Sequence, residues 1–422
     1  MRNYWNFYWP LALMGIGLVL SMQFQNATIA RYPQAVNELA TLALAFGVFG
    51  FFNAGLQFVS QLANVFARSP HALRQTQRFV WLVGITLTLP IGLMATSVTG
   101  HTLLQTIFAI DAELATRVSA YLMLMTPLIL LNCHRHHLTG LLIQARLTRW
   151  VTVYNFTYLG VVTATLLTGF WLELTPMYVV VGAEMLGVLA LLSCLVYARY
   201  NLYCLPAEPS HNEVTLLELT RFFIPVSTTG FMFALSRPIL FAFAARSPNA
   251  LLTIASLRVA FDFTMIFQQA ANQFRHFFIS FGFDDLTGKR AFMRYVALGL
   301  TAFMALISMT PIADWVWGSL IGLPADLLQL AIESMWVLCL TPATIIYRNY
   351  FHSRLMHMRR TAGMAYGSGI RVLAIFVAAA LLQTTGYLNH LTASACLILG
   401  FVVEAFVSQW MHARVTAELQ ND

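Results

Sequence analysis

Three charged side chains inside apolar segments are of the types that bind small ions. Arg237 lies in "SRPILFAFAARSP", and Arg258 and Asp262 lie in "LRVAFDF". A charged group inside an apolar segment is rare and usually has a function. Two arginines against one aspartate leave a net positive charge, and guanidinium groups bind carboxylate or phosphate through paired hydrogen bonds. We therefore predict that Arg237, Arg258 and Asp262 bind a small anionic substrate.

A structural network is the alternative for the same residues. Arg258 and Asp262 are four residues apart, so on a helix they share one face and can pair with each other. Arg237 precedes Pro238, and its guanidinium can bind carbonyl groups that the proline leaves without a donor. The residue types alone leave both interpretations open.

Two polar residues of the first apolar segment, Gln23 and Asn26, lie at a depth that matches Arg237. We predict that they line the other side of the same substrate cavity. Hydrogen bonding between helices is the alternative.

Two glutamates, Glu184 and Glu404, lie well inside the sixth apolar segment of each half of the chain. A buried carboxyl group that takes up a proton can carry it across a membrane. Both residues are therefore candidates for coupling or proton transfer. Pairing with a neighbouring arginine is the alternative.

Histidine stands beside arginine in "NCHRHH" at 132–137 and in "FHSRLMH" at 351–357. Closely spaced histidines can bind zinc, but a histidine-dependent membrane enzyme needs several such clusters with carboxylates nearby. We favour a basic cytoplasmic rim that attracts anions, formed by Arg135, His137, Arg348 and His352. The chain has no Walker A, HExxH or GxSxG sequence. We expect no metal, no cofactor and no enzymatic activity.

The composition requires lipid as the solvent around these residues. Of the 422 residues, 59% are hydrophobic and 10% are charged, and the mean hydropathy is +0.69. A soluble domain carries about 25% charged residues, and a membrane span needs roughly 20 apolar residues. These criteria predict an all-α integral membrane protein with twelve transmembrane helices, at about 8–30, 36–66, 79–99, 116–141, 148–170, 176–198, 217–245, 250–280, 292–313, 327–350, 362–384 and 390–411.

The basic residues between these segments predict the orientation. With the N-terminus in the cytoplasm, seventeen basic residues fall on the cytoplasmic side, and only Arg31, Arg117 and Arg246 fall outside. Positive charge concentrates on the cytoplasmic side of membrane proteins. We therefore predict a multi-pass protein of the inner (plasma) membrane with both termini in the cytoplasm. This topology explains the basic balance better than nucleic acid as a partner does.

An internal repeat divides the chain into two halves. Shifted by 215 residues, positions 10–52 match positions 225–267 at 14 of 43 places, including Pro10 with Pro225 and Arg31 with Arg246. Further on, Arg135 matches Arg348 at a shift of 213. Both copies begin inside and contain six spans, so the repeats are parallel, and substrate is expected where the lobes meet. We predict an N-terminal lobe at 1–200, a cytoplasmic linker at 201–215 and a C-terminal lobe at 216–422.

Two parallel six-helix lobes resemble the multidrug/oligosaccharidyl-lipid/polysaccharide (MOP) exporter superfamily, which includes the multidrug and toxin extrusion (MATE) proteins. Several short pieces match one family within it: "YWPL" at 8–11, "SRPI" at 236–239 with Arg246 downstream, Pro342 with Arg348, the pair Arg359–Arg360, and "GFVVEAF" at 400–406, which contains Glu404. In these pieces the chain resembles the progressive ankylosis protein family, as a bacterial-type member. The resemblance implies export of small polyanions, with citrate and nucleotide triphosphate as substrates.

These observations predict a secondary transporter that exports a small organic or phosphorylated anion, similar to citrate or ATP, by alternating access between two lobes. Efflux of drugs or other amphipathic compounds is one alternative, and flipping of a lipid-linked sugar is another. The predicted partners are the substrate and the lipid bilayer. A fold of this kind needs no second subunit to enclose a path, so we expect a monomer.

Overall fold

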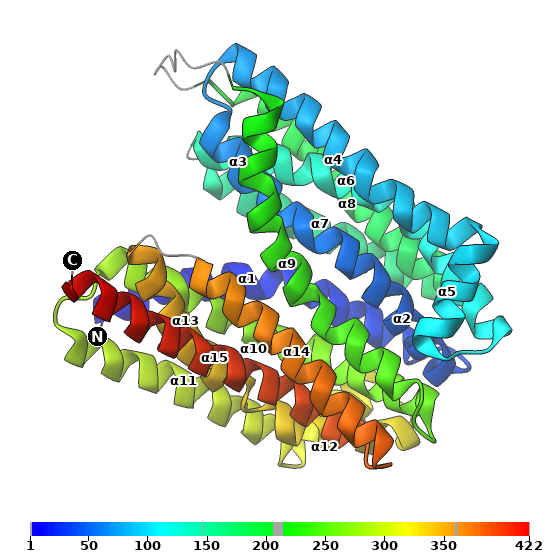
Figure 1. Ribbon diagram of the computed structural model, residues 1–422. Coiled ribbons are helices and arrows are strands. Elements are labelled where there is room, and N and C mark those ends of the chain that lie inside the picture. The colour runs from blue at the N-terminus through cyan, green and yellow to red at the C-terminus, as the bar shows by residue number, and fades with distance from the viewer. Residues whose placement is uncertain (1, 146, 206–213, 359–361, 422) are drawn as a thin grey trace. The chain divides into compact units, whose positions relative to one another are not determined.

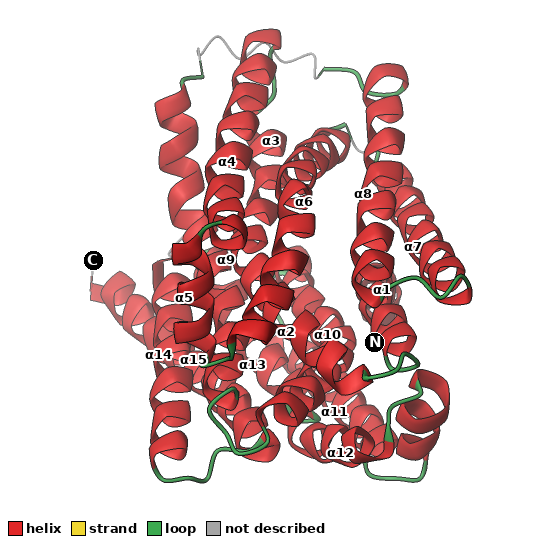
Figure 2. Cartoon of the chain, turned by 90° about the vertical axis from the view of Figure 1, so that its right-hand side faces the viewer, coloured by secondary structure: helices red, strands yellow, loops and turns green. Residues whose placement is uncertain are grey.

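Helices make up nearly all of the described chain. The computed structural model describes residues 2–145, 147–205, 214–358 and 362–421, and Figure 2 shows helices joined by short loops, with no strand in these ranges. Most of the predicted linker and the pair Arg359–Arg360 lie outside the described residues. The elements are α1 (Arg2–Ile29), α2 (Ala35–Ala54), η1 (Gly55–Phe58), α3 (Val59–Phe66), α4 (Pro70–Thr96), α5 (Val98–Phe108), α6 (Ala112–Gln144), α7 (Thr148–Trp171), α8 (Pro176–Asn201), α9 (Leu216–Ala244), α10 (Ala250–Phe281), α11 (Leu286–Ser308), η2 (Asp314–Ile321), α12 (Ala325–Leu338), α13 (Thr341–His357), α14 (Ala362–Thr384) and α15 (His390–Asn421).

Ten helical segments of the described chain are long and apolar enough to cross a membrane. They coincide with ten of the twelve predicted spans. The spans predicted at 8–30 and 217–245 are present as the helices α1 and α9, and the described stretch Gly230–Ala244 of α9 is apolar. The fold is therefore an all-α multi-pass membrane fold, and the count of twelve spans is not confirmed.

Two predicted spans are interrupted. The span predicted at 36–66 divides into α2, η1 and α3, and a Cβ atom on Gly55 at the start of η1 would lie 2.7 Å from the ring of Phe231. The span predicted at 327–350 divides into α12 and α13. Pro342 stands in the first turn of α13, where its missing amide hydrogen removes no helical hydrogen bond.

Two short helices that the sequence did not predict connect longer ones. The helix α5 begins after Ser97, whose hydroxyl accepts a hydrogen bond from the amide of Gly100 at 2.9 Å. The π-helical segment η2 ends at Gly322, which has a φ of 82° that favours glycine. Arg31 donates to the carbonyl oxygens of Leu320 and Ile321, each at 2.7 Å, and so ties the end of η2 to the end of α1.

The chain forms two compact units whose bounds differ from the predicted lobes. Unit 1 comprises Met1–Ala40 and Ile239–Asp422, and unit 2 comprises Thr41–Pro238. The boundaries therefore fall inside α2 and inside α9. Figure 1 shows α13, α14 and α15 beside one another in unit 1, and α4, α6 and α8 beside one another in unit 2.

The units differ from the predicted lobes because α1, the first helix of the N-terminal lobe, packs in unit 1, whereas most of α9, the first helix of the C-terminal lobe, packs in unit 2. The helix α1 packs on α10, where the hydroxyl of Tyr8 donates to the carbonyl oxygen of Ala270 at 2.9 Å. The first part of α9 packs in unit 2, where the rings of Phe222 and Phe223 lie 5.3 and 5.5 Å from those of Phe66 and Phe79. Aromatic contacts of this kind decide which helices form one core, and sequence order does not reveal them.

The close packing of α3 on α6 gives a first testable prediction. A Cβ atom on Gly140 of α6 would lie 2.8 Å from the Cα of Ser60 and closer still to its carbonyl oxygen. Because backbone cannot move aside as a flexible side chain can, we expect Gly140→Ala to destabilise the protein by about 1–3 kcal/mol. Thermal unfolding of the purified protein in detergent measures this change.

The matched control is Gly160→Ala on α7, because beyond the local backbone of α7 no atom of the described residues lies within 4 Å of the added Cβ there. Replacement of glycine by alanine inside a helix stabilises it by about 0.5–1 kcal/mol. Equal effects of the two substitutions would contradict the close contact of α3 and α6.

Candidate functional site

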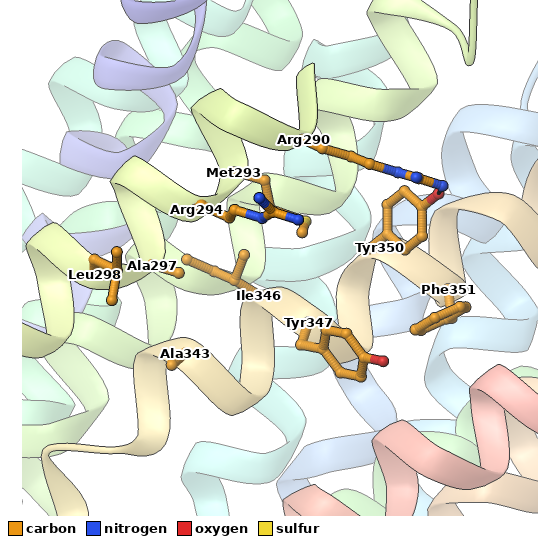
Figure 3. A pocket seen from close by; sticks show the side chains of 10 residues that line it. All are labelled: Arg290, Met293, Arg294, Ala297, Leu298, Ala343, Ile346, Tyr347, Tyr350 and Phe351. Atoms are coloured by element: carbon orange, nitrogen blue, oxygen red, sulfur yellow. Dashed lines mark hydrogen bonds between the residues drawn. The ribbon is translucent and has the colours of Figure 1, made fainter. Parts of the chain in front are cut away.

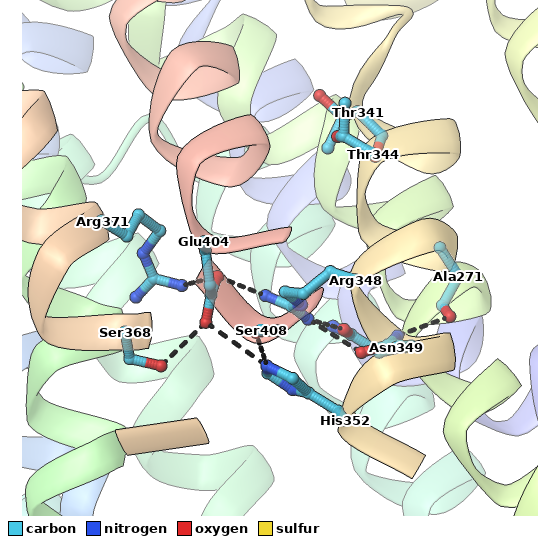
Figure 4. A network of polar contacts seen from close by, with 11 residues as sticks. Ala271, Thr341, Thr344, Arg348, Asn349, His352, Ser368, Arg371, Glu404 and Ser408 are labelled. Atoms are coloured by element: carbon cyan, nitrogen blue, oxygen red, sulfur yellow. Dashed lines mark hydrogen bonds and ion pairs between the residues drawn. The ribbon is translucent and has the colours of Figure 1, made fainter. Parts of the chain in front are cut away.

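A carboxylate in unit 1 holds two arginines. Glu404 of α15 is 1% exposed. Its Oε2 atom accepts hydrogen bonds from Nη1 of Arg348 on α13 at 3.0 Å and from Nη1 of Arg371 on α14 at 2.8 Å. Its Oε1 atom accepts from the hydroxyl of Ser368 at 2.8 Å. Figure 4 shows the three helices converging on this carboxylate.

The second amino group of Arg348 connects the carboxylate to α10. Its Nη2 atom donates to Oδ1 of Asn272 at 2.9 Å and to Oδ1 of Asn349 at 3.2 Å. Asn349 in turn donates to the carbonyl oxygen of Ala271 at 3.0 Å. The guanidinium of Arg348 is therefore held from two directions, which fixes its position before any ligand binds.

A histidine completes the group. The Nε2 atom of His352 lies 3.0 Å from the hydroxyl of Ser408 and 4.0 Å from Oε1 of Glu404. Helix periodicity places these residues, because side chains three or four apart share a face. A spacing of three or four residues separates the two members on each of the three helices. We call this group the Glu404 cluster; it comprises Arg348 and His352 of α13, Ser368 and Arg371 of α14, and Glu404 and Ser408 of α15.

The charges of the Glu404 cluster do not cancel, because two guanidinium groups face one carboxylate. Arg371 is 0% exposed. The ring of Phe401 lies 5.7 Å from the guanidinium carbon of Arg348 and 5.6 Å from that of Arg371, which gives both cations a favourable aromatic face. Burial removes the water that would screen the excess charge. The cluster therefore presents a preorganised positive centre inside unit 1.

The sequence identified part of this cluster and misplaced part of it. Glu404 was predicted as a proton carrier, and the structure shows the alternative arrangement, in which arginine pairs with it. Arg348 and His352 were predicted at a cytoplasmic rim, but they are buried within the span Ala325–Leu355. They turn inward because Glu404 and its neighbours supply the partners that a buried cation needs.

Arg371 was missed. It is the one charged residue of "AGMAYGSGIRVLAIFVAAALLQT", the sequence of α14. A single arginine in a predicted span is a functional candidate by itself, so the sequence did contain the relevant observation.

The predicted pair Arg258 and Asp262 forms a second buried network in unit 1. Nη2 of Arg258 lies 3.6 Å from Oδ2 of Asp262. Asn26 of α1 bridges them, since its Oδ1 atom accepts from Nε of Arg258 at 3.2 Å and its amide donates to Oδ2 of Asp262 at 3.2 Å. This arrangement agrees with the structural alternative, and it also explains why α1 packs on α10.

The other predicted substrate residues lie apart from this pair. Arg237 is half-buried and belongs to unit 2, so its participation in one site with Arg258 stays a prediction. Gln23, one turn before Asn26, is 9% exposed, and neither polar atom of its side chain has a hydrogen-bond partner among the described residues. A buried amide without a partner is costly, and a role of Gln23 in substrate binding stays a prediction.

Unit 2 contains a neutral counterpart of the Glu404 cluster. The phenol of Tyr158 on α7 donates to Oε2 of Glu184 on α8 at 2.7 Å, and Arg135 of α6 interacts electrostatically with Glu184. The shift of 213 that relates Arg135 to Arg348 also relates Tyr158 to Arg371. The two halves therefore differ by one positive charge at this site.

His137 does not form a solvent-exposed rim. It is buried on α6, with Nε2 at 3.4 Å from the hydroxyl of Thr76 on α4. Its neighbour His134 contacts α4 as well, with Nδ1 at 3.3 Å from the amide of Gln77. These histidines face α4 because α4 and α6 pack along their length. No group of three histidine, cysteine or acidic residues in the described part of the chain is arranged to hold a metal ion.

The fold is similar to solved structures of transporters at low sequence identity. An inward-facing multidrug resistance MATE family transporter of the MOP superfamily matches with a TM-score of 0.79 at 12% identity, over 98% of each chain. The lipid II flippase MurJ in an inward closed conformation matches with a TM-score of 0.66 at 13% identity, over 94% of this chain and 87% of that one.

A third solved structure is a MOP superfamily transporter from Pyrococcus furiosus, for which a reversed polarity of the binding pocket suggests a different function. It matches with a TM-score of 0.61 at 13% identity, over 96% of this chain and 95% of that one. The chain therefore has the same fold as these MATE-like transporters. Neither a family model nor a curated protein matches the sequence.

Proposed function

We propose that the protein is a secondary transporter of the MOP type that exports a small organic or phosphorylated anion by alternating access. It acts as a monomer in the inner membrane with both termini in the cytoplasm. Citrate and nucleotide triphosphates are the first substrates to test, because the sequence resembles the progressive ankylosis family in the pieces given above. The excess of positive charge in the Glu404 cluster is the observation that supports an anion as cargo.

Electrostatics favours an anionic ligand at this cluster. Two guanidinium groups share one carboxylate oxygen, Oε2 of Glu404. A substrate carboxylate or phosphate that approaches Arg371 or Arg348 competes with Glu404 for the same donors and brings the missing negative charge. Charge interactions in a low dielectric are strong, so a cation would be repelled from the same place.

The fold supports transport and leaves the cargo open. Structures with this fold include a multidrug transporter and a lipid II flippase, so drug efflux and flipping of a lipid-linked sugar are the alternatives. The Pyrococcus furiosus protein has a pocket of reversed polarity, which supports the idea that pocket charge differs among proteins of this fold. In this chain, the arginines favour the anion.

Flux in proteoliposomes tests the proposal. Vesicles that contain the purified protein are loaded with labelled citrate, labelled ATP or a cationic dye, and release is followed against vesicles without protein. We expect saturable release of at least one anion and release of the dye at the background rate. Dye release without anion release would overturn the proposal in favour of drug efflux.

A further inference from the structure

The helices α11 and α13 enclose a groove of about 450 Å³ in unit 1. Its walls come from one face of each helix, because the lining residues follow one another at intervals of three and four. Figure 3 shows two arginines of α11 at one end, and tyrosine and phenylalanine side chains of α13 along the other wall. The groove is separate from the residues of the Glu404 cluster, although α13 contributes to both.

One end of the groove is cationic. The Nη2 atom of Arg290 donates to the hydroxyl of Tyr350 at 2.9 Å, and its guanidinium carbon lies 5.6 Å from the ring centre of Tyr350. Arg294, one turn further along α11, is exposed and makes no hydrogen bond or ion pair with the part of the chain that the structure describes. No acidic side chain lines the groove. Its positive charge is therefore available to a ligand.

The other end is apolar and open to the side. Ala297 and Leu298 of α11 face Ala343 and Ile346 of α13, and Leu298 is 65% exposed. Eight residues separate Arg290 from Leu298, which corresponds to about 12 Å along the helix. The groove therefore changes from cationic to apolar over a length that suits a headgroup and the first part of an acyl chain.

The place of the groove along the membrane spans fits the same type of molecule. Both helices belong to candidate spans, Leu286–Ser308 and Ala325–Leu355. Arg290 and Arg294 lie in the first turns of α11, so the cationic end is at the end of a span and the apolar end is toward its middle. Lipid phosphates lie at the ends of spans, and basic pockets between helices bind acidic headgroups there.

We propose that this groove binds an anionic phospholipid, with the phosphate on Arg290 and Arg294 and an acyl chain against Ala297, Leu298 and Ala343. The bound lipid joins α11 to α13, the helix that carries Arg348 and His352. The proposal does not depend on the identity of the transported substrate.

Thermal unfolding of the purified full chain in detergent tests the site. Phosphatidylglycerol, phosphatidylcholine with the same acyl chains, and glycerol 3-phosphate are each titrated. We expect phosphatidylglycerol to raise the melting temperature at concentrations where the other two have little effect. Arg294→Gln is expected to weaken the apparent affinity for phosphatidylglycerol about fivefold, the effect of one arginine near an acidic lipid.

Two further variants make the test specific. Arg78→Gln removes an arginine of α4 that is also exposed, and it should leave the affinity unchanged. Ala297→Phe fills the apolar end while both arginines stay, and it should weaken binding of the lipid. Equal effects of Arg78→Gln and Arg294→Gln would overturn the site in favour of general surface charge. If glycerol 3-phosphate raised the melting temperature as much as phosphatidylglycerol does, the arginines would bind a soluble anion and the lipid site would be overturned.

Discussion

Replacement of Glu404 by glutamine is expected to lower the free energy of unfolding by about 3–5 kcal/mol, because two buried arginines would then face each other without a carboxylate. Glutamine keeps the size of the side chain and can still accept from one donor, so lost packing contributes little. The loss of stability comes from the positive charge of the two arginines, which no carboxylate then balances. Unfolding of the purified variant by heat or by a denaturing detergent measures the effect.

Glu184→Gln is the matched control. Glu184 is half-buried, accepts from the phenol of Tyr158 and faces one arginine, Arg135, whereas Glu404 faces two. Its replacement should therefore cost about 1–3 kcal/mol, less than the loss of Glu404. The double variant Glu404→Gln with Arg371→Gln should recover part of the stability, since one of the uncompensated charges is gone. A double variant that is less stable than Glu404→Gln alone would contradict this account of the cluster.

Arg371→Gln is expected to reduce anion flux about 10- to 150-fold, the range that corresponds to the loss of one charged hydrogen bond. The variant should unfold at nearly the temperature of the wild type. Arg348 and Glu404 remain as a neutral pair after this change, whereas Glu404→Gln leaves two cations. Arg371→Gln should therefore lower the flux while it leaves the unfolding temperature nearly unchanged, whereas a purely structural role of Arg371 predicts that flux falls only together with stability.

The flux assay needs two control variants, a conservative substitution of Arg371 and a substitution at its equivalent position in unit 2. Arg371→Lys keeps the charge but loses the planar donor pair, and it should retain more flux than Arg371→Gln. Tyr158→Phe alters the counterpart of Arg371 in unit 2 without a change of charge, so its flux should stay within about twofold of the wild type, the effect of a weak neutral contact. Unchanged flux in Arg371→Gln would remove the Glu404 cluster from the transport path.

The lengths of the helices could be predicted from the sequence because lipid imposes a simple rule. A span needs roughly 20 apolar residues, and ten predicted segments meet it in the structure. The breaks at Gly55 and before Pro342 could not be placed, since apolar composition continues across both. The assignment of α1 to unit 1 was also missed, because it depends on Tyr8, Asn26 and their partners on α10.

The candidate site was predicted only in fragments. Glu404 was recognised from its position in a span, but the loop arginines were placed by the preference of positive charge for the cytoplasm, and Arg348 was counted among them. A buried arginine is stable only when another helix supplies its partner. The packing of α13, α14 and α15 shows that partner, and the sequence of each helix taken alone does not.

The packing of α1 on α10 has a consequence for biosynthesis. The hydrogen bond from Tyr8 to Ala270 joins residues 262 positions apart. Translation proceeds at about 5–20 residues per second, so α1 waits on the order of 13–50 s in the bilayer before its partner helix has been made. During that time its aromatic face and Asn26 can contact lipid, the translocon, chaperones or the helices already made, but not their partners on α10. Premature release of α1 from the translocon would expose these groups, and a chain truncated before α10 would leave α1 without its native partner.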